Sequence, residues 1–155
     1  MPKRYWLFKS EPTSYSWADL VKDGVAEWDG VRNFQARNML RDEIKEGDEV
    51  LFYHSSVTPT AVVGVAKVVK SGHGDKTAWD PKSAHPDPKS TPDNPIWYVV
   101  DIKAADKFPR EVTMDEMRQN PRLAKMLLLK RGMRLSVQPV TPEEFREVCE
   151  MAKQP

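Results

Sequence analysis

The segment 61–70 (AVVGVAKVVK) most constrains the fold, because it is apolar at both alternating sets of positions. A strand with one solvent-facing side alternates apolar and polar residues, whereas an apolar run without alternation is typical of a strand covered on both faces. The chain therefore needs elements packed on both sides of a sheet. Further strands are predicted over 4–9, 49–54, 96–103 and 135–140.

Helices are predicted between and after these strands. They are expected to begin near Ser16, Asn33, Thr113 and Thr141, and three of these residues start a capping-box pattern. The element order is strand, two helices, three strands, helices, strand and helix. This order favours an α+β fold, with a curled sheet or open barrel and helices packed outside it.

The length of 155 residues fits one domain over residues 1–155 with a single core. The one cysteine, Cys149, excludes an internal disulfide and indicates a reducing compartment. No apolar run is long enough for a signal peptide or a membrane span, so we expect a cytoplasmic protein without membrane contact. Residues 71–95 hold five of the thirteen prolines without periodicity. A long loop of this kind is usually functional or disordered.

The net charge of +1 argues against a strongly basic nucleic-acid coat, yet the charges are unevenly distributed. Between Glu116 and Glu143 there is no acidic residue, and six are basic: Arg118, Arg122, Lys125, Lys130, Arg131 and Arg134. Such a stretch produces a local positive field. A solvated helix face has the same composition, and it is the favoured interpretation of such a stretch taken alone.

Patterns typical of enzymes are absent from the sequence. It contains no GxGxxG, GxxxxGK[ST], GxSxG or HExxH. The three histidines are dispersed and, with one cysteine, match no metal-ligand spacing. We therefore expect no catalytic residue, no metal and no cofactor. His54 and Ser55, at a strand end, offer a base and a nucleophile, which keeps a hydrolase as an alternative.

Three short stretches carry the side chains that a site for a planar ligand needs. Residues 9–12 (KSEP) end the first strand, where backbone and hydroxyl groups are free to face a ligand. Residues 28–38 (WDGVRNFQARN) join a tryptophan and a glycine turn to a helix rich in amide and guanidinium groups, which bind base edges and phosphates. Residues 77–81 (TAWDP) place a tryptophan in a polar loop. A plain turn, a core tryptophan and a packed loop are the corresponding structural alternatives.

The five tryptophans divide into two groups. Trp6, Trp17 and Trp97 fall on predicted strands or a helix, and we expect them in the core. Trp28 and Trp79 lie beside turns, where two indole planes can hold a base between them. Base–aromatic stacking contributes on the order of 1–3 kcal/mol per base.

Seven pieces, in order over nearly the whole chain, resemble the EVE family of the PUA-like superfamily. They are WLFKSEP (6–12), WDGVRNFQARNML (28–40), GDEVLFYHS (47–55), VVGVAKVV (62–69), TAWDP (77–81), WYVVDI (97–102) and RLSVQPVTPEEF (134–145). The resemblance implies a PUA-like curled β-sheet or open β-barrel flanked by helices. EVE domains are also similar to YTH domains, which bind methylated adenine in RNA through an aromatic cage.

That similarity implies a set of ligand-binding residues. A strand-end Lys-Ser pair would line the cage, two tryptophans would form its walls, and groups at the start of the next helix would bond the ligand edge. A strand-end His-Ser pair would lie at the mouth. In this order the residues are Lys9, Ser10, Trp28, Trp79, Val31, Arg32, Asn33, His54 and Ser55.

The sequence therefore predicts a non-catalytic module that binds a modified nucleobase within DNA or RNA, extruded from its stack and held between two tryptophans. Arg37, Arg131 and Arg134 are expected to contact the phosphate backbone, so that affinity falls with salt. Two alternatives stay open. One is a nucleotide or base hydrolase that uses His54 and Ser55, and the other is a protein or RNA scaffold that acts through the basic stretch 118–134.

Overall fold

The computed structural model describes residues 3–154, which form one six-stranded mixed sheet. Its strands are β1 (Tyr5–Ser10), β2 (Val25–Glu27), β3 (Glu49–His54), β4 (Ala61–Gly74), β5 (Tyr98–Thr113) and β6 (Val137–Val140). They lie in the order β2-β5-β4-β3-β1-β6, and only β1 and β3 are parallel within this described sheet. The edge strands β2 and β6 do not pair with each other over residues 3–154, so the sheet is open. The predicted α+β class is confirmed.

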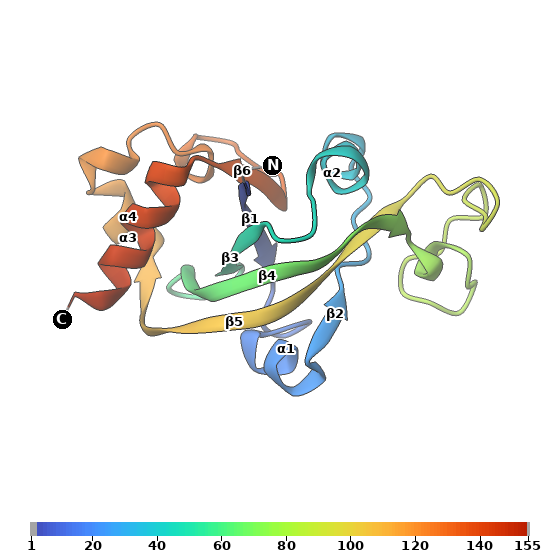
Figure 1. Ribbon diagram of the computed structural model, residues 1–155, viewed down its shortest axis with the longest axis horizontal. Coiled ribbons are helices and arrows are strands. Elements are labelled where there is room, and N and C mark those ends of the chain that lie inside the picture. Colours follow the sequence, from blue (N-terminus) through green and yellow to red (C-terminus); the bar gives the residue numbers. More distant parts are fainter. Residues whose placement is uncertain (1–2, 155) are drawn as a thin grey trace.

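The helices lie around this sheet (Figure 1). They are α1 (Trp17–Asp23), α2 (Phe34–Asn38), α3 (Met114–Arg118) and α4 (Pro142–Lys153), with a π turn η1 (Met39–Glu43) and 3-10 turns η2 (Lys76–Ala78), η3 (Pro121–Leu123) and η4 (Leu127–Leu129). In Figure 1, α1 and α2 flank the long β4–β5 pair from below and above, and α3 and α4 gather at one end. No helix in residues 3–154 has the length and apolar character needed to cross a membrane.

The predicted capping boxes fix where three of these helices begin. At α1, the Ser16 hydroxyl accepts from the Asp19 N–H at 3.1 Å, and the Asp19 carboxylate accepts from the Ser16 N–H at 2.9 Å. The same reciprocal pair occurs at Thr113 before α3 and at Thr141 before α4. Each box satisfies two backbone donors that a helix start leaves without partners.

The sheet separates two hydrophobic clusters. In β1, Trp6 and Phe8 belong to one cluster and Leu7 to the other, because successive side chains of a strand point to opposite faces. The cluster around Leu7 is covered by α4 through Phe145 and Val148. In β4, Val62 and Val65 belong to the cluster around Leu7, and Ala66 and Val68 belong to the other, so the burial on both faces predicted for residues 61–70 is confirmed.

Two strands extend beyond their predicted ends. β4 continues to Gly74 and β5 to Thr113, and the additional residues 71–74 pair with the start of β5. The backbone ladder carries the strands past their apolar stretches, so the apolar pattern marked only part of each. The three-residue β2 at the sheet edge was not predicted. The Pro-rich segment therefore contributes its first residues to the sheet, and the loop begins after Gly74.

The remainder of the Pro-rich segment is a loop at the far end of the β4–β5 pair (Figure 1), held by buried polar groups. Asp75 and Ser90 are almost fully buried. The Ser90 hydroxyl accepts from the Ile96 N–H at 2.9 Å, and the Asp87 carboxylate accepts from the Trp97 indole N–H at 2.6 Å. These bonds replace the regular secondary structure that the prolines exclude.

Candidate functional site

A cleft of about 820 Å³ opens between the end of β1 and the segment that links β2 to α2. Such a volume is in the usual range for small-ligand sites. Six of the predicted ligand-binding residues line this cleft: Lys9, Ser10, Trp28, Val31, Arg32 and Asn33. The other three, His54, Ser55 and Trp79, are not among its lining residues.

The end of β1 reaches the cleft because β1 is held between β3 and β6. The Lys9 N–H donates to the carbonyl of Ser136 at 2.8 Å, and the Lys9 ammonium donates to the carbonyl of Met133 at 3.3 Å. Burial lowers the pKa of Lys9. The Ser10 hydroxyl donates to the carbonyl of Tyr15. Lys9 is therefore positioned by the segment that precedes β6, and Ser10 by the turn that follows β1.

Trp28 belongs to the core as well as to the cleft. Its side chain is only 9% exposed, and its ring packs against Phe8 at 5.2 Å and edge-on to Phe52 at 5.6 Å between centroids. The backbone N–H of Trp28 donates to the carbonyl of Val100 at 2.8 Å, and this bond continues the pairing of β2 with β5. The cleft thus meets a limited part of a rigidly held indole.

The Pro-rich loop reaches the cleft through His85 rather than through Trp79. The Trp79 ring lies against Gly74, where an added Cβ would be 2.9 Å from it. His85 lies over Gly30, where an added Cβ would be 2.6 Å from its Nε2. Gly30 also has φ +78°, so this glycine is required both by its backbone and by the histidine above it.

An ion pair between a buried carboxylate and a partly exposed guanidinium connects this loop to the turn after Trp28. The Arg32 guanidinium bonds the Asp75 carboxylate at 2.9 Å and the His85 carbonyl at 2.6 Å. Asp75 also accepts from the N–H groups of Gly30 at 3.0 Å and Thr77 at 2.9 Å. Burial raises the pKa of Asp75, but the hydrogen bonds outweigh this effect and hold the pKa below its usual value. Arg32 therefore shapes the cleft by fixing the loop.

The start of α2 forms the rim of the cleft. The Asn33 side-chain oxygen accepts from the Ala36 N–H at 3.0 Å and caps the helix. Its amide nitrogen is the remaining group for a ligand. Arg37, a predicted phosphate contact, donates to the carbonyl of Ile96 at 2.7 Å and lies over the Phe34 ring at 5.0 Å. Part of its guanidinium is therefore already bonded within the protein.

His54 and Ser55 support the turn after β1. The imidazole Nε2 of His54 accepts from the Trp17 N–H at 3.1 Å, so this nitrogen carries no proton. Burial lowers the pKa of His54, which favours the same neutral form. The Ser55 N–H donates to the carbonyl of Ser10 at 2.9 Å. The acceptor atom that a general base would use is thus already hydrogen-bonded.

Sequence reasoning did not select the carboxylates of the cleft, which belong to Glu11, Asp23, Glu27 and Asp29. Asp23 accepts from the hydroxyl of Tyr15, another lining residue, at 2.8 Å. Asp29 as a whole residue is exposed. Partial burial of its carboxyl group nevertheless raises its pKa, and the negative charge of Asp75 raises this pKa further. Its position between Trp28 and Gly30 was the available signal.

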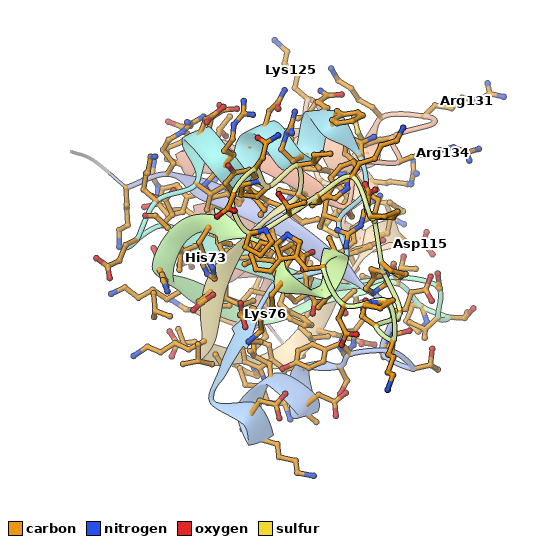
Figure 2. The ribbon with its side chains drawn as sticks, turned by 90° about the vertical axis from the view of Figure 1, so that its right-hand side faces the viewer. His73, Lys76, Asp115, Lys125, Arg131 and Arg134 are labelled. Carbon is orange, nitrogen blue, oxygen red and sulfur yellow. The ribbon has the colours of Figure 1, made fainter. Side chains whose placement is uncertain are left out.

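The end of the basic stretch borders the cleft beside β6, where the carbonyls of Met133 and Ser136 accept from Lys9. Lys125, Arg131 and Arg134 extend from the body of the protein (Figure 2). Of the six basic residues of this stretch, only Arg122 makes an ion pair within residues 3–154, with Glu147 at 3.5 Å. The guanidinium groups of Arg131 and Arg134 are therefore not engaged by a carboxylate within residues 3–154 and can bind an anionic ligand.

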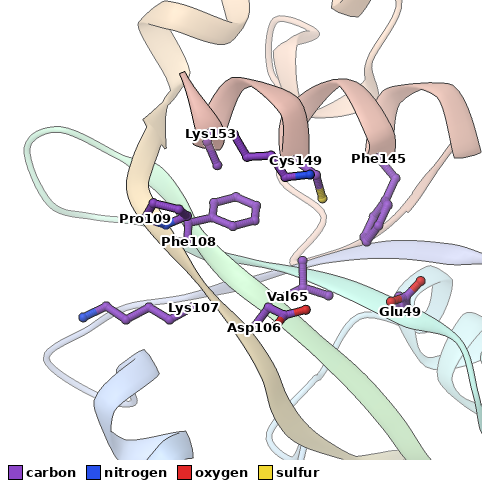
Figure 3. Close-up of a pocket in the computed structure, with 10 residues that line it drawn as sticks. Glu49, Val65, Asp106, Lys107, Phe108, Pro109, Phe145, Cys149 and Lys153 are labelled. Carbon is purple, nitrogen blue, oxygen red and sulfur yellow. The ribbon is translucent and has the colours of Figure 1, made fainter. Parts of the chain in front are cut away.

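A second cavity, of about 410 Å³, lies between α4 and the β4–β5 pair (Figure 3). None of the predicted ligand-binding residues lines it, and its walls include Phe108 and Phe145. Burial raises the pKa of the Cys149 thiol there to about 11, so the thiol is protonated and a weak nucleophile.

Three further groups converge from three strands: Glu27, His73 and Asp101, each with one potential metal-ligand atom within 4.8 Å of the others. Ion pairs within the protein already account for the close approach of these three groups. His73 Nε2 bonds Asp101 at 2.7 Å, and Lys76 pairs with Glu27 at 3.1 Å. Lys76 already neutralises one of the carboxylates that a metal would use.

Comparisons with known proteins identify the family of the chain. The model of the EVE domain matches residues 4–151. Thymocyte nuclear protein 1 of Mus musculus is 39% identical over 160 residues, which cover 91% of this chain and 70% of that protein. An uncharacterized protein of Schizosaccharomyces pombe is 39% identical over 168 residues, covering 99% and 70%.

Solved structures share the fold at similar identity. A hypothetical protein from Leishmania major has a TM-score of 0.92 at 40% identity, over 98% of this chain and 96% of that one. The human THYN1 protein, in complex with DNA that contains 5-methylcytosine, has a TM-score of 0.90 at 35% identity and covers 99% of both chains.

Proposed function

The chain belongs to the EVE domain family, and on that premise we propose that it is a non-catalytic module that binds DNA by holding one modified base in the cleft. DNA is favoured over RNA because the human relative was solved with DNA that contains 5-methylcytosine. A paired base does not reach a recessed cleft without leaving its stack, so binding includes extrusion of that base.

The observation that carries this proposal is the convergence of six predicted residues on one cleft. They come from two segments far apart in sequence, the end of β1 and the turn before α2. Trp28 supplies an aromatic surface, and Lys9 supplies a donor from the opposite segment. An aromatic surface with a few polar groups around it is the usual design of a site for a planar ligand.

The polar groups of the cleft fit an amino-bearing base such as cytosine. The Asp29 carboxylate can accept from an exocyclic amine, as acidic side chains do with cytosine N4. The Lys9 ammonium can donate to a ring carbonyl. Selection for a methyl group would then come from the apolar lining, which includes Val31 and Trp28, and from the cleft volume.

The cationic side chains next to the cleft fit the phosphates on either side of an extruded base. Arg131 and Arg134 project from the segment that bonds Lys9, on the β6 side of the cleft. Arginine binds phosphate through paired N–H donors. These contacts position the nucleic acid without reading its sequence.

The test uses Lys9→Met rather than Trp28→Ala, because removing a buried tryptophan ring costs about 3–5 kcal/mol and would disturb the core. Duplexes that each carry one modified base, and their RNA counterparts, are titrated in a fluorescence anisotropy assay. We expect the wild-type protein to prefer one modified DNA at least tenfold over plain DNA, and Lys9→Met to lose most of that preference.

The matched control is Lys107→Met, which removes an exposed lysine that lines the other cavity; its preference should equal that of the wild type. Equal wild-type affinity for all modified and plain oligonucleotides would overturn the proposal. So would release of a base or nucleotide on prolonged incubation, which would support the hydrolase. Binding abolished by charge reversal at Arg131 and Arg134 but unaffected by Lys9→Met would favour the scaffold.

A further inference from the structure

One aromatic side chain at the cleft rim is exposed to solvent. Three large apolar side chains are exposed in the described chain, Val21, Val25 and Phe34, and Phe34, at 59%, is the aromatic one. It directly follows Asn33, which lines the cleft, but Phe34 itself is outside the lining. Its ring is therefore beside the cleft and not within it.

The exposed ring is held in place by its neighbours. It stacks on Trp97, with 4.9 Å between ring centroids and 27° between planes, and the Arg37 guanidinium lies 5.0 Å from its centre. Trp97 is 6% exposed, and its indole N–H bonds Asp87 at 2.6 Å. An apolar ring at this exposure gains little from burial. It is nevertheless held in a fixed position, because the Trp97 ring beneath it is buried and hydrogen-bonded.

A base that leaves a DNA duplex leaves a gap in the stack and an unpaired partner base. Proteins that distort DNA often insert an apolar side chain at such a step, because the contact offsets an unstacking cost of a few kcal/mol. The rim of the cleft is where that gap would lie when the extruded base occupies the cleft. Phe34 is an exposed, preoriented aromatic ring at this place.

We propose that Phe34 is a wedge that enters the base stack of duplex DNA and occupies the space left by the extruded base. The inference rests on the proposed function and adds to it the form of the partner, which is double-stranded. A single strand has no partner base and no gap to hold open, so the ring contributes to duplex binding and not to the capture of a base from a single strand.

The experiment measures the affinity of wild type and Phe34→Ala for one modified base placed in a duplex and in the corresponding single strand. We expect Phe34→Ala to weaken duplex binding at least tenfold and single-strand binding less than twofold. Phe34→Leu, which keeps an apolar tip without the stack on Trp97, should lie between the two for the duplex. A fluorescent adenine analogue opposite the modified base reports on unstacking and should brighten with wild type and not with Phe34→Ala.

The matched control is Val21→Ala, which removes another exposed apolar side chain, on α1. It should bind both forms as the wild type does. Equal losses on duplex and single strand, in a variant with unchanged thermal stability, would overturn the wedge and make Phe34 part of the base site. Unchanged affinity of Phe34→Ala for both duplex and single strand would also overturn the wedge. Phe34 would then serve only to shield Trp97 from solvent. Failure of the wild type to bind either form would instead refute the proposed function.

Discussion

At the scale of single residues, His54 shows how a candidate catalytic group can have a structural purpose. Its Nε2 accepts the N–H of Trp17, the first residue of α1. That backbone group would otherwise be one of the donors that a helix start leaves without an intrahelical partner. The imidazole can accept this bond only in its neutral form, so protonation of His54 would remove the bond and leave a charge in a partly buried place.

We therefore predict that His54 makes the protein less stable as the pH falls. Burial lowers its pKa in the folded state, while the charge of Glu111 acts in the opposite direction. In the unfolded chain this histidine has an ordinary pKa of about 6.5. As the pH falls, the unfolded chain therefore takes up the proton at a higher pH than the folded protein does. The stabilisation is fully present above that pH and is lost as the pH falls through the lower, folded-state pKa.

Urea unfolding at several pH values from about 7 down to about 5 checks this prediction. The wild type should lose stability over this range, and His54→Gln should lose less. An unchanged slope in His54→Gln would contradict the prediction.

Individual site residues differed in how well the sequence revealed them. Trp28 could be selected because it precedes a glycine turn and a polar helix within one continuous stretch. His85 could not, because its place depends on Gly30 having no Cβ and on the Arg32–Asp75 pair, which bring together positions far apart in the chain. Trp79 had the more suggestive residue type, yet its ring packs on Gly74.

At the scale of elements, the Pro-rich loop is fixed to the cleft by the pair between Arg32 and Asp75. The side chain of Asp75 is 1% exposed and that of Arg32 is 24% exposed. A buried carboxylate that loses a charged partner keeps its desolvation cost. The Arg32 guanidinium is therefore one of the groups that hold the loop, together with the bonds made by Ser90 and Asp87.

We predict that Arg32→Met lowers the free energy of unfolding by about 2 kcal/mol, the typical value of a hydrogen bond to a charged group. Asp75 would retain its bonds from Gly30 and Thr77, which limits the loss. Urea denaturation measures it, and faster proteolysis within residues 75–95 should accompany it. Arg41→Met, which removes an exposed pair with Asp42 at 2.8 Å, is the control. Similar small losses in both variants would contradict the prediction.

The secondary structure was predictable where side chains dictate it. Alternation or its absence located β1, β3 and the first part of β4, and capping residues located α1, α3 and α4. The short β2 was missed because a three-residue edge strand owes its conformation to pairing with β5. The ends of β4 and β5 were missed for the same reason, since partner strands and not local composition extend them.

At the scale of the whole molecule the net charge is only +1, but residues 131–136, which reach the cleft beside β6, include two arginines and no acidic residue. The side chains of Arg131 and Arg134 extend outward from the body of the protein (Figure 2). Each phosphate neutralised on duplex DNA releases counterions, so the logarithm of affinity falls with the logarithm of salt by about 0.9 per contact.

We predict that the double change Arg131→Gln and Arg134→Gln reduces this salt slope by about 2. Preference for the modified base should remain, because backbone contacts do not read the base. Binding titrations over a range of salt concentrations give the slope. Arg146→Gln, which removes an arginine of α4 paired with Glu143 at 3.8 Å, should leave it unchanged. An unaltered slope in the double variant would show that these two arginines do not contact phosphate.

The placement of β1 has a consequence for how the protein is made. This strand, near the start of the chain, is hydrogen-bonded on one side to β6, and its Lys9 bonds Met133, 124 positions later in the sequence. Contacts between such distant positions form slowly, and on a ribosome the bonds of Lys9 must wait until Met133 has emerged. The cleft is therefore completed only after residues 133–140 have been made, because a shorter chain lacks the partners of β1 and of Lys9.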